Sequence, residues 1–343
     1  MELMLKPEIY TFTQLTEAEF LKHQAALKPV IVPLEQSPVW GAFNDSIAGR
    51  KFLGSFRYDD TSGKLVGLAS ATLYKEKGRN WIWIKHGPIF ATEPNTEVIQ
   101  KMCATLKTQF GTTQYDSPLF IRLSMVQKTA GLVLPFEHTM YDETVVIDLT
   151  KTEDEILAGM SQSGRQGIRK AAKASVTVAE ISENYSDYFA KHCYPILKET
   201  GARDGFGIHP LSLYTTMLTA LPEYSRLYVA LHNKSVEAWM ITTEYNGQAM
   251  YYYGASSAKA RETFAAYALQ WEVIKVMKTR GNSTYDLMGI AGKHYSGLKN
   301  VTQFKTKFSK NIVSIPFTYD LPIQRFRYQA FALALKAKRR LKR

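Results

Sequence analysis

The feature that most constrains the fold of this chain is an order of segments that occurs twice, about 170 residues apart. The first copy comprises three strand-like runs, a helical segment and a returning strand-like run, at 52–58, 64–74, 80–84, 97–109 and 119–123. The second copy repeats this order at 226–231, 235–245, 249–253, 264–277 and 284–288. Short runs separated by polar turns are typical of antiparallel meanders, so both halves are predicted to share a β-β-β-α-β plan.

This plan predicts a mixed α/β (α+β) protein of two domains, 1–144 and 145–320, each a mostly antiparallel sheet flanked by helices. It resembles the core of the GNAT acyltransferase fold, in tandem. Residues 321–343 are expected to form a basic amphipathic helix that packs back on the first domain. No sustained heptad insert interrupts the second half, so no coiled-coil arm is expected.

The positive charge of the chain is concentrated at its C-terminal end. The formal net charge is +12, and the segment 325–343 carries eight basic residues and no acidic one, so the rest of the chain has a net charge of only +4. An apolar stripe along this segment is expected to dock on the body and to present the cations to RNA or to anionic lipid. The alternative is a solvated helix packed on the body.

Several classes of chemistry have no support in the sequence. Walker A, G-x-G-x-x-G, G-x-S-x-G and H-E-x-x-H motifs are absent from it, and Cys103 and Cys193 have no zinc-like spacing. Neither 86–95 nor 254–261 has the glycine-rich phosphate cradle of GNAT enzymes that use acetyl-CoA, so acetyl-CoA is not expected as the donor. Residues 1–12 lack the apolar core of a signal peptide and no run of 18 apolar residues occurs, which predicts a cytoplasmic protein.

A cationic stripe is predicted near the start of the second domain. Thr152 and Glu155 form a capping-box pattern that opens a helix. Along that helix Arg165, Arg169 and Lys173 occur at i, i+4 and i+8, a spacing that places them on one face, where they can follow a phosphate backbone. The alternative is a solvated helix face.

Six segments in order resemble one family. They are Thr144 to Leu149 with Ser161 to Ala171, Arg203 to Pro210, Tyr251 to Ser256, Gln270 to Glu272, Tyr285 to Ile290, and Phe304-Lys305-Thr306-Lys307-Phe308. Together they are similar to the FemABX peptidoglycan bridge aminoacyltransferases. The resemblance implies an aminoacyl-tRNA donor, an acceptor amine on a cell-wall precursor (lipid II or UDP-MurNAc-pentapeptide), and no metal, CoA or covalent enzyme intermediate.

The resemblance also implies roles for particular residues. The expected catalytic residues are Lys305, which stabilises the oxyanion or the released tRNA 3′ end, and Tyr253. The expected acceptor contacts are Trp40, Arg203, His209, Tyr214, Tyr251 and Phe304. The expected tRNA contacts are Arg165, Arg169, Lys173 and Lys307.

Several of these roles have a plainer alternative. Strand alternation predicts Tyr251 and Tyr253 on the cleft side and Tyr252 in the core, although all three tyrosines are also compatible with a core position. Lys305 is otherwise a surface lysine on a strand. Arg203 is otherwise half of a structural pair with Asp204.

The chain also departs from the family pattern. Gly41-Ala42-Phe43-Asn44 follow Trp40 where the family has a lysine that contacts a diphosphate, so that contact is absent or moved to Arg50 or Lys51. His209 stands where the family has an arginine. Arg122-Leu123-Ser124-Met125 stand where the family often has an acid. The missing lysine and the basic tail favour lipid II as the acceptor.

The leading hypothesis is therefore a monomeric aminoacyltransferase that builds the peptidoglycan bridge, cytoplasmic and peripheral at the inner face of the membrane. Two hypotheses stay open beside it. One is an enzyme that moves an amino acid from tRNA to a protein N-terminus, and the other is a non-catalytic protein that binds RNA or a membrane surface. The sequence does not identify the amino acid transferred.

Overall fold

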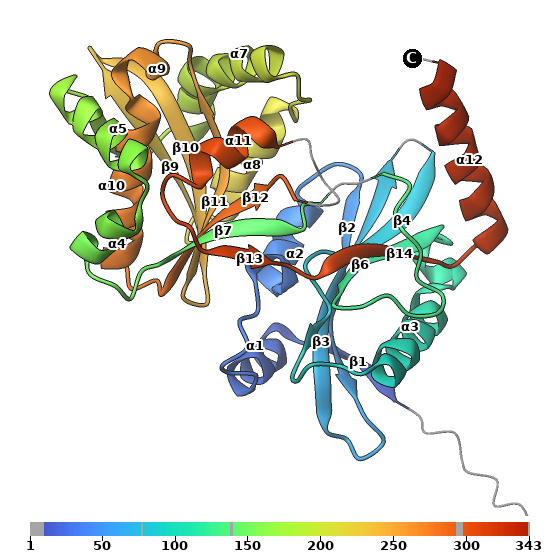
Figure 1. Cartoon of the computed structure of the whole chain (residues 1–343). Helices are drawn as coiled ribbons and strands as arrows, with labels where there is room; N and C mark the ends of the chain where they lie inside the picture. The colour runs from blue at the N-terminus through green and yellow to red at the C-terminus, as the bar shows by residue number, and fades with distance from the viewer. Residues whose placement is uncertain (1–9, 77, 138–139, 293–297, 342–343) are drawn as a thin grey trace, which may run out of the picture. The chain divides into compact units, whose positions relative to one another are not determined.

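The computed structural model describes residues 10–76, 78–137, 140–292 and 298–341, which form two compact units (Figure 1). The first unit is Met1–Thr139 with Pro316–Arg343, and the second is Met140–Ile315. Each unit is a mixed sheet with helices packed on it, which confirms the predicted α/β class. In the described part of the chain, none of the helices combines the length and the hydropathy of a membrane span.

The first sheet has the order β1-β2-β3-β4-β6-β14, with β5 paired to β3. Its strands are β1 (Thr11–Leu15), β2 (Arg50–Asp59), β3 (Leu65–Glu76), β4 (Arg79–Ile84), β5 (Ile89–Phe90), β6 (Phe120–Met125) and β14 (Phe317–Pro322). Its helices are α1 (Glu17–Ala26), α2 (Pro38–Asp45), α3 (Thr96–Phe110) and α12 (Arg325–Leu341). The predicted first meander is confirmed as β2-β3-β4, and the returning strand β6 pairs parallel to β4.

Helix α3 forms the core of the first unit with this sheet. Ile99, Met102, Leu106 and Phe110 recur at helical spacing and are fully buried. They pack in one cluster with sheet residues such as Ile121. The side chain of Asn95 accepts a hydrogen bond from the Val98 N–H and so caps the start of the helix.

The last strand of the chain belongs to the first sheet. The expected boundaries placed 317–320 in the second domain, but β14 pairs antiparallel with β6, from Phe317 opposite Met125 to Pro322 opposite Phe120. The buried Arg122 donates two hydrogen bonds to the buried carboxylate of Asp320, at 2.7 and 2.9 Å. This ion pair ties β14 to β6, because either charge alone would be costly to bury.

The second sheet has the order β13-β7-β12-β11-β10-β9-β8. Its strands are β7 (Glu143–Asp148), β8 (Thr177–Ile181), β9 (Ser225–His232), β10 (Ser235–Tyr245), β11 (Gln248–Ser256), β12 (Thr284–Ile290) and β13 (Ile312–Ser314). Its helices are α4 (Glu153–Gly159), α5 (Gln162–Lys173), α6 (Tyr185–Tyr188), α7 (Tyr194–Asp204), α8 (Leu211–Ala220), α9 (Ala260–Thr263), α10 (Ala265–Thr279) and α11 (Lys299–Lys305). The predicted second meander is confirmed as β9-β10-β11, and β12 returns parallel to β11.

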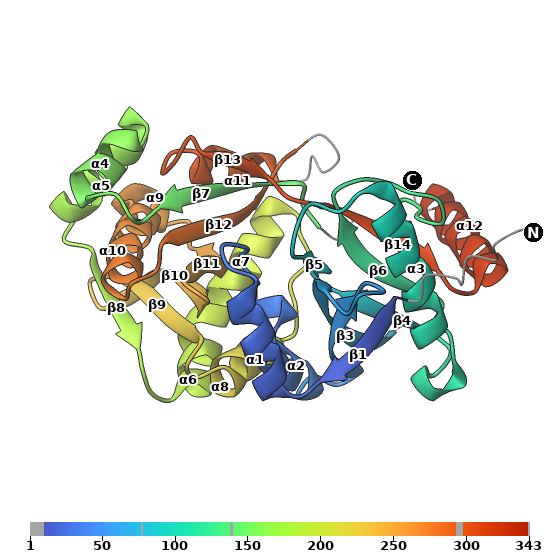
Figure 2. The same ribbon diagram turned by 90° about the horizontal axis from the view of Figure 1, so that it is seen from below.

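Helices cover both faces of the second sheet (Figure 2). On one face, α10 buries Leu269, Val273 and Ile274 in the same cluster as Met240 of β10. Trp239, the neighbour of Met240 along β10, points to the other face. There its ring contacts Phe189, which precedes α7, and Tyr214 of α8. Strand alternation explains this division between the two faces.

One helix expected to be continuous is broken. The helix that Thr152 caps ends at Gly159, and Ser161 caps a new helix, α5, by accepting a hydrogen bond from the Gly164 N–H. Arg165 therefore lies on a different helix from the capping box, although the box itself is confirmed. The expected helix at 264–277 is confirmed as α10, and Phe264, whose φ is 60°, separates it from the short helix α9 that precedes it.

Candidate functional site

The parallel pair β11–β12 provides the frame of the candidate site. Its register runs from Gln248 opposite Thr284 to Met250 opposite Asp286. Both strands continue beyond this point, β11 to Ser256 and β12 to Ile290. Residues at the carboxyl ends of parallel strands share one edge of a sheet, so side chains that follow the paired register are brought together there.

Lys305 lies at this edge, at the last residue of α11. Its side chain is buried, with only 6% of the residue exposed, so the surface-strand alternative is wrong. The Lys305 ammonium donates a 2.8 Å hydrogen bond to the Gly289 carbonyl at the end of β12. Burial lowers the pKa of Lys305 from 10.5 to about 7, although the nearby charge of Asp286 acts in the opposite direction.

Asp286 is itself fixed in place. The Thr144 hydroxyl donates a hydrogen bond to its carboxylate, and the Met288 N–H donates another at 2.6 Å. The register between β12 and β7 shifts after Asp286, and Met288 takes a φ of 60° that non-glycine residues rarely adopt. This irregular strand end places the Gly289 carbonyl against Lys305.

Tyr251 shares the environment of Lys305. The Lys305 Nζ lies 5.8 Å from the centre of the Tyr251 ring. The hydroxyl of Tyr251 lies against Gly254, where a β-carbon would collide with it. Burial raises the pKa of Tyr251 to about 12, so its hydroxyl stays protonated and can donate a hydrogen bond at neutral pH.

Tyr251 and Tyr253 do not share a face, which corrects the expected alternation. Ile241 of β10 is opposite Tyr253, whereas the next residue, Thr242, is opposite Tyr251, so Tyr252 is the extra residue of a β-bulge. The bulge reverses the side on which the following residue lies. Tyr251 thus faces Lys305, and Tyr253 faces the helices on the opposite side.

Tyr253 belongs to an aromatic group on that opposite side. Its ring lies 4.9 Å from the ring of Tyr214 and 6.2 Å from that of His209. The His209 N–H donates a 3.3 Å hydrogen bond to the Tyr214 hydroxyl. Burial raises the pKa of Tyr214 to about 12. The structure therefore joins three of the predicted site residues in one group and Lys305 with Tyr251 in another.

The remaining predicted acceptor contacts are held by local partners. Arg203 forms an ion pair with Asp204 at 3.1 Å and donates to the Ser256 carbonyl at 3.1 Å, which is the geometry of the structural alternative. Phe304 precedes Lys305 and packs on Phe308, with ring centres 5.1 Å apart. Their role in binding an acceptor stays a prediction.

Trp40 belongs to the first unit, where it is buried in α2. The ammonium of Lys85 lies 5.1 Å from the centre of the Trp40 ring and 3.5 Å from the buried carboxylate of Glu35. A cation thus does accompany Trp40, but it comes from the end of β4. Arg50, one of the expected substitutes, instead donates a hydrogen bond to Asn44.

The four predicted tRNA contacts differ in their surroundings. The Arg165 guanidinium donates to the carbonyls of Leu157, Ala158 and Met160 at the C-terminal end of α4, so it caps that helix. Lys307 donates a 2.7 Å hydrogen bond to the Tyr267 hydroxyl. Arg169 and Lys173 are exposed on α5.

The two glycines of the Ser-Gly-Arg-Gln-Gly segment allow α5 to approach its neighbours closely. A β-carbon on Gly164 would meet the Lys307 carbonyl at 2.5 Å, and one on Gly167 would meet the Tyr267 ring. The segment that carries Lys305 is therefore packed directly on α5. This close packing gives a structural reason for Gly164 and Gly167 within the motif.

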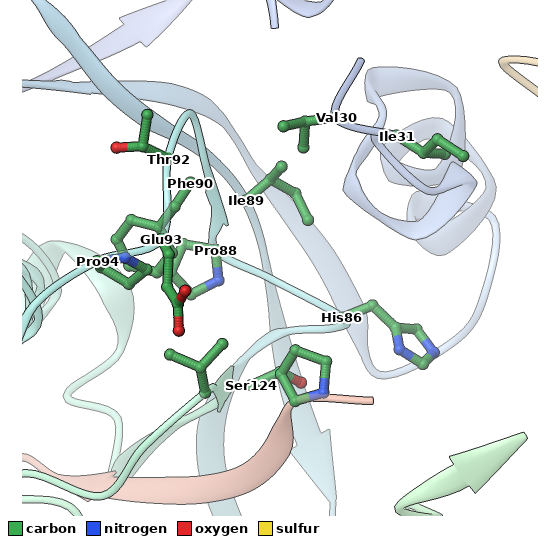
Figure 3. A pocket seen from close by; sticks show the side chains of 12 residues that line it. Val30, Ile31, His86, Pro88, Ile89, Phe90, Thr92, Glu93, Pro94 and Ser124 are labelled. Atoms are coloured by element: carbon green, nitrogen blue, oxygen red, sulfur yellow. The ribbon is translucent and has the colours of Figure 1, made fainter. Parts of the chain in front are cut away.

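The first unit contains a separate apolar pocket of about 280 Å³ (Figure 3). Its lining is mainly apolar and includes Val30, Ile89 and Phe90, with His86 and Glu93 as ionisable groups. Burial lowers the pKa of His86, so the imidazole is neutral at pH 7. The pocket offers shape and apolar surface, whereas the site at Lys305 offers a buried amine beside a carboxylate.

Sequence reasoning missed Asp286, Gly254 and Lys85 as parts of these sites. Asp286 occurs in an otherwise apolar strand run, which was an available signal because a buried carboxylate requires hydrogen-bond donors. Gly254 directly follows three tyrosines, where a glycine often marks close approach of another group. Lys85 had no comparable signal.

Comparison with known proteins agrees with this architecture. A family model described as the FemAB family matches residues 130–238 and 236–336, together more than half of the chain. Aminoacyltransferase FemA of Staphylococcus aureus is 28% identical over 96 residues, a match that covers 27% of this chain and 23% of FemA. The chain thus aligns with less than a quarter of that relative's length.

Solved structures extend the likeness in fold to nearly the whole chain. A crystal structure of FemX superposes with a TM-score of 0.71 at 15% identity, covering 94% of this chain and 100% of that one. A tandem GNAT protein from the clavulanic acid biosynthesis pathway superposes with a TM-score of 0.50 at 10% identity, covering 92% and 99%. The predicted tandem GNAT-like fold is confirmed.

Proposed function

The chain belongs to the FemAB family, and from this premise we propose that it transfers an aminoacyl group from tRNA to the stem-peptide amine of a peptidoglycan precursor. The observation that carries the proposal is the buried Lys305 beside Tyr251 and Asp286, at the edge where β11 and β12 leave their paired register. The lipid-linked and the UDP-linked precursor present the same amine, so both are candidate acceptors.

The reaction needs a positive charge and a route for a proton. The acceptor amine attacks the carbonyl carbon of the aminoacyl ester, a C–N bond forms, and the C–O bond to the tRNA ribose breaks after a tetrahedral oxyanion. The nitrogen loses a proton and the released ribose oxygen gains one. A fixed cation near the oxyanion lowers the barrier, and a group with a pKa near 7 can exchange the proton at neutral pH.

Lys305 fits both requirements in this proposal. Its pKa of about 7 makes both the ammonium and the amine available at neutral pH. One of the three ammonium donors is used by the Gly289 carbonyl, which fixes the direction of the side chain and leaves two for substrate. We assign the protonated hydroxyl of Tyr251 a supporting hydrogen bond to the carbonyl oxygen of the aminoacyl ester, a role that was expected of Tyr253.

The test is single-turnover transfer from a mixed pool of charged tRNAs to lipid II and to UDP-MurNAc-pentapeptide, read by mass spectrometry. Replacing Lys305 with Ala is expected to slow transfer about 100-fold or more, as for loss of an oxyanion donor. Lys310→Ala, which removes an exposed lysine from the same segment, serves as the matched control and should leave the rate unchanged. An unchanged rate for Lys305→Ala would remove Lys305 from the mechanism.

If wild-type protein binds charged tRNA but adds mass to neither acceptor, the cell-wall assignment is wrong. A peptide with a free N-terminus is then the next acceptor to offer. Transfer to that peptide would identify the enzyme as an N-terminal aminoacyltransferase. Binding without transfer to any amine would favour the non-catalytic hypothesis.

A further inference from the structure

Helix α12 is anchored to the first unit by one apolar face. The Tyr328 hydroxyl donates a 2.8 Å hydrogen bond to the buried Asp320 carboxylate, and its ring centre lies 5.5 Å from that of Phe120. One turn further on, the ring of Phe331 lies 5.4 Å from that of Phe136. Tyr328 and Phe331 are three residues apart and so lie on one face of the helix, the inner face, which packs on the first unit.

A second apolar line runs along the outer face of the same helix. Phe326 is 86% exposed and Leu333 is 67% exposed, larger fractions than those of the other exposed large apolar side chains in the described part of the chain. Ala330 and Ala337 are exposed as well. The four occur at i, i+4, i+7 and i+11, so they form one continuous line, here called the outer apolar stripe.

Cations border this stripe on both sides. At about 100° per residue, Arg325 and Lys336 lie along one edge of the stripe and Arg327 and Lys338 along the other, and all four are exposed. The sequence of 325–343 contains no acidic residue. The expected helix had a single apolar face against the body, whereas this helix has two, and the cations flank the one that faces outward.

We propose that the outer apolar stripe is a docking surface for an anionic lipid bilayer. A helix of this kind lies in the plane of the interface, with its apolar line in the boundary between headgroups and acyl chains and its flanking cations on lipid phosphates. Phe326 and Leu333 then leave water, and each of the four described cations meets a negative charge. The stripe belongs to the first unit, whereas Lys305 and Tyr251 belong to the second.

The arrangement favours a bilayer over RNA. A nucleic acid backbone is bound by contiguous cations, and its phosphates gain nothing from exposed Phe326 and Leu333. Here the apolar line separates the two rows of cations. A bilayer interface uses both features at once, because it offers an apolar layer directly beneath a layer of phosphate charge.

The experiment measures flotation of the full chain with phosphatidylcholine vesicles, with and without phosphatidylglycerol. Binding is expected only with phosphatidylglycerol and should weaken as salt rises. Phe326→Ser with Leu333→Ser should lower the partition coefficient roughly ten-fold per side chain, and Lys336→Gln with Lys338→Gln about five-fold per charge. Leu134→Ser is the matched control, because Leu134 is 57% exposed but lies outside the helix, and it should have no effect.

Three outcomes would overturn the proposal. The first is unchanged vesicle binding by the Phe326/Leu333 double variant with an unchanged thermal melt. The second is binding of tRNA, but not of vesicles, that depends on Lys336 and Lys338. The third is a concentration-dependent dimer that the double variant abolishes. Because the double variant should retain transfer to the water-soluble UDP-linked acceptor, a failure here is distinguishable from a failure of the proposed function.

Discussion

Replacing Lys305 with Met is expected to make the protein more stable at neutral pH while it abolishes transfer. In the folded chain the pKa of Lys305 falls to about 7, whereas the unfolded chain keeps the ordinary value of 10.5. Between these two values the unfolded state binds more protons than the folded state, so the stability of the wild type rises with pH in this window. Methionine has a similar length and no charge, so this dependence should disappear.

The magnitude follows from the same two values. A fall in pKa from 10.5 to about 7 corresponds to a cost of about 5 kcal/mol for the folded ammonium below pH 7, an upper limit for a buried group. Methionine also loses the hydrogen bond to the Gly289 carbonyl and leaves that oxygen unsatisfied, which costs about 2 kcal/mol. The variant should therefore be about 3 kcal/mol more stable at pH 6, and this advantage should vanish near pH 9.

The assay is urea unfolding of both proteins at several pH values between 6 and 9.5, with Lys310→Met as the control for loss of an exposed lysine. The informative quantity is the slope of the stability difference against pH, about 1.4 kcal/mol per pH unit above pH 7. A Lys305→Met protein that is less stable than wild type by the same amount at every pH would refute the reasoning. Such a result would mean that Lys305 is held as a fully stabilised ammonium.

Two further changes test the packing of the site and the tRNA surface. Gly254→Ala places a methyl group on the Tyr251 hydroxyl, so transfer should fall about ten-fold or more while far-UV circular dichroism stays unchanged; unaltered transfer would remove Tyr251 from the site. Arg165→Gln should cost about 1–2 kcal/mol of stability in urea unfolding with little change in tRNA affinity, since Arg165 caps α4. Arg169→Gln with Lys173→Gln should lower the salt slope of tRNA binding by about 1.5–2 without loss of stability, and the reverse pattern would contradict these assignments.

The regular elements were predictable because their periodicities are local. Alternation and turn residues located β2-β3-β4 and β9-β10-β11, and a 3.6-residue period located α3 and α12. Both signals are properties of neighbouring residues. The repeated order of these elements was then sufficient to predict the tandem fold.

The irregular features depend on partners that are distant in sequence. The bulge at Tyr252 arises from its register with β10, and no local pattern marks it, so alternation assigned Tyr253 to the wrong face. The break after Gly159 is explained by Arg165, which caps the end of α4. The burial of Lys305 depends on Gly289 and on packing against α5, neither of which is adjacent to it in sequence.

The resemblance of sequence motifs identified Lys305 but not its chemistry. A motif gives residue types in order, whereas the pKa of about 7 results from burial, which the nearby charge of Asp286 only partly offsets. Arg203 and Arg165 match the motif equally well, yet each has backbone carbonyls as partners.

The membership of β14 in the first sheet has a consequence for the order of folding during synthesis. Arg122 and its partner Asp320 are 198 residues apart, and the ribosome makes the entire second unit between them. The second unit can therefore fold as soon as it emerges, while the first still lacks an edge strand and carries a guanidinium without its carboxylate. The unit whose synthesis begins first is thus completed last, and in the interval the exposed edge of β6 is the site at which a chaperone or a second nascent chain would bind.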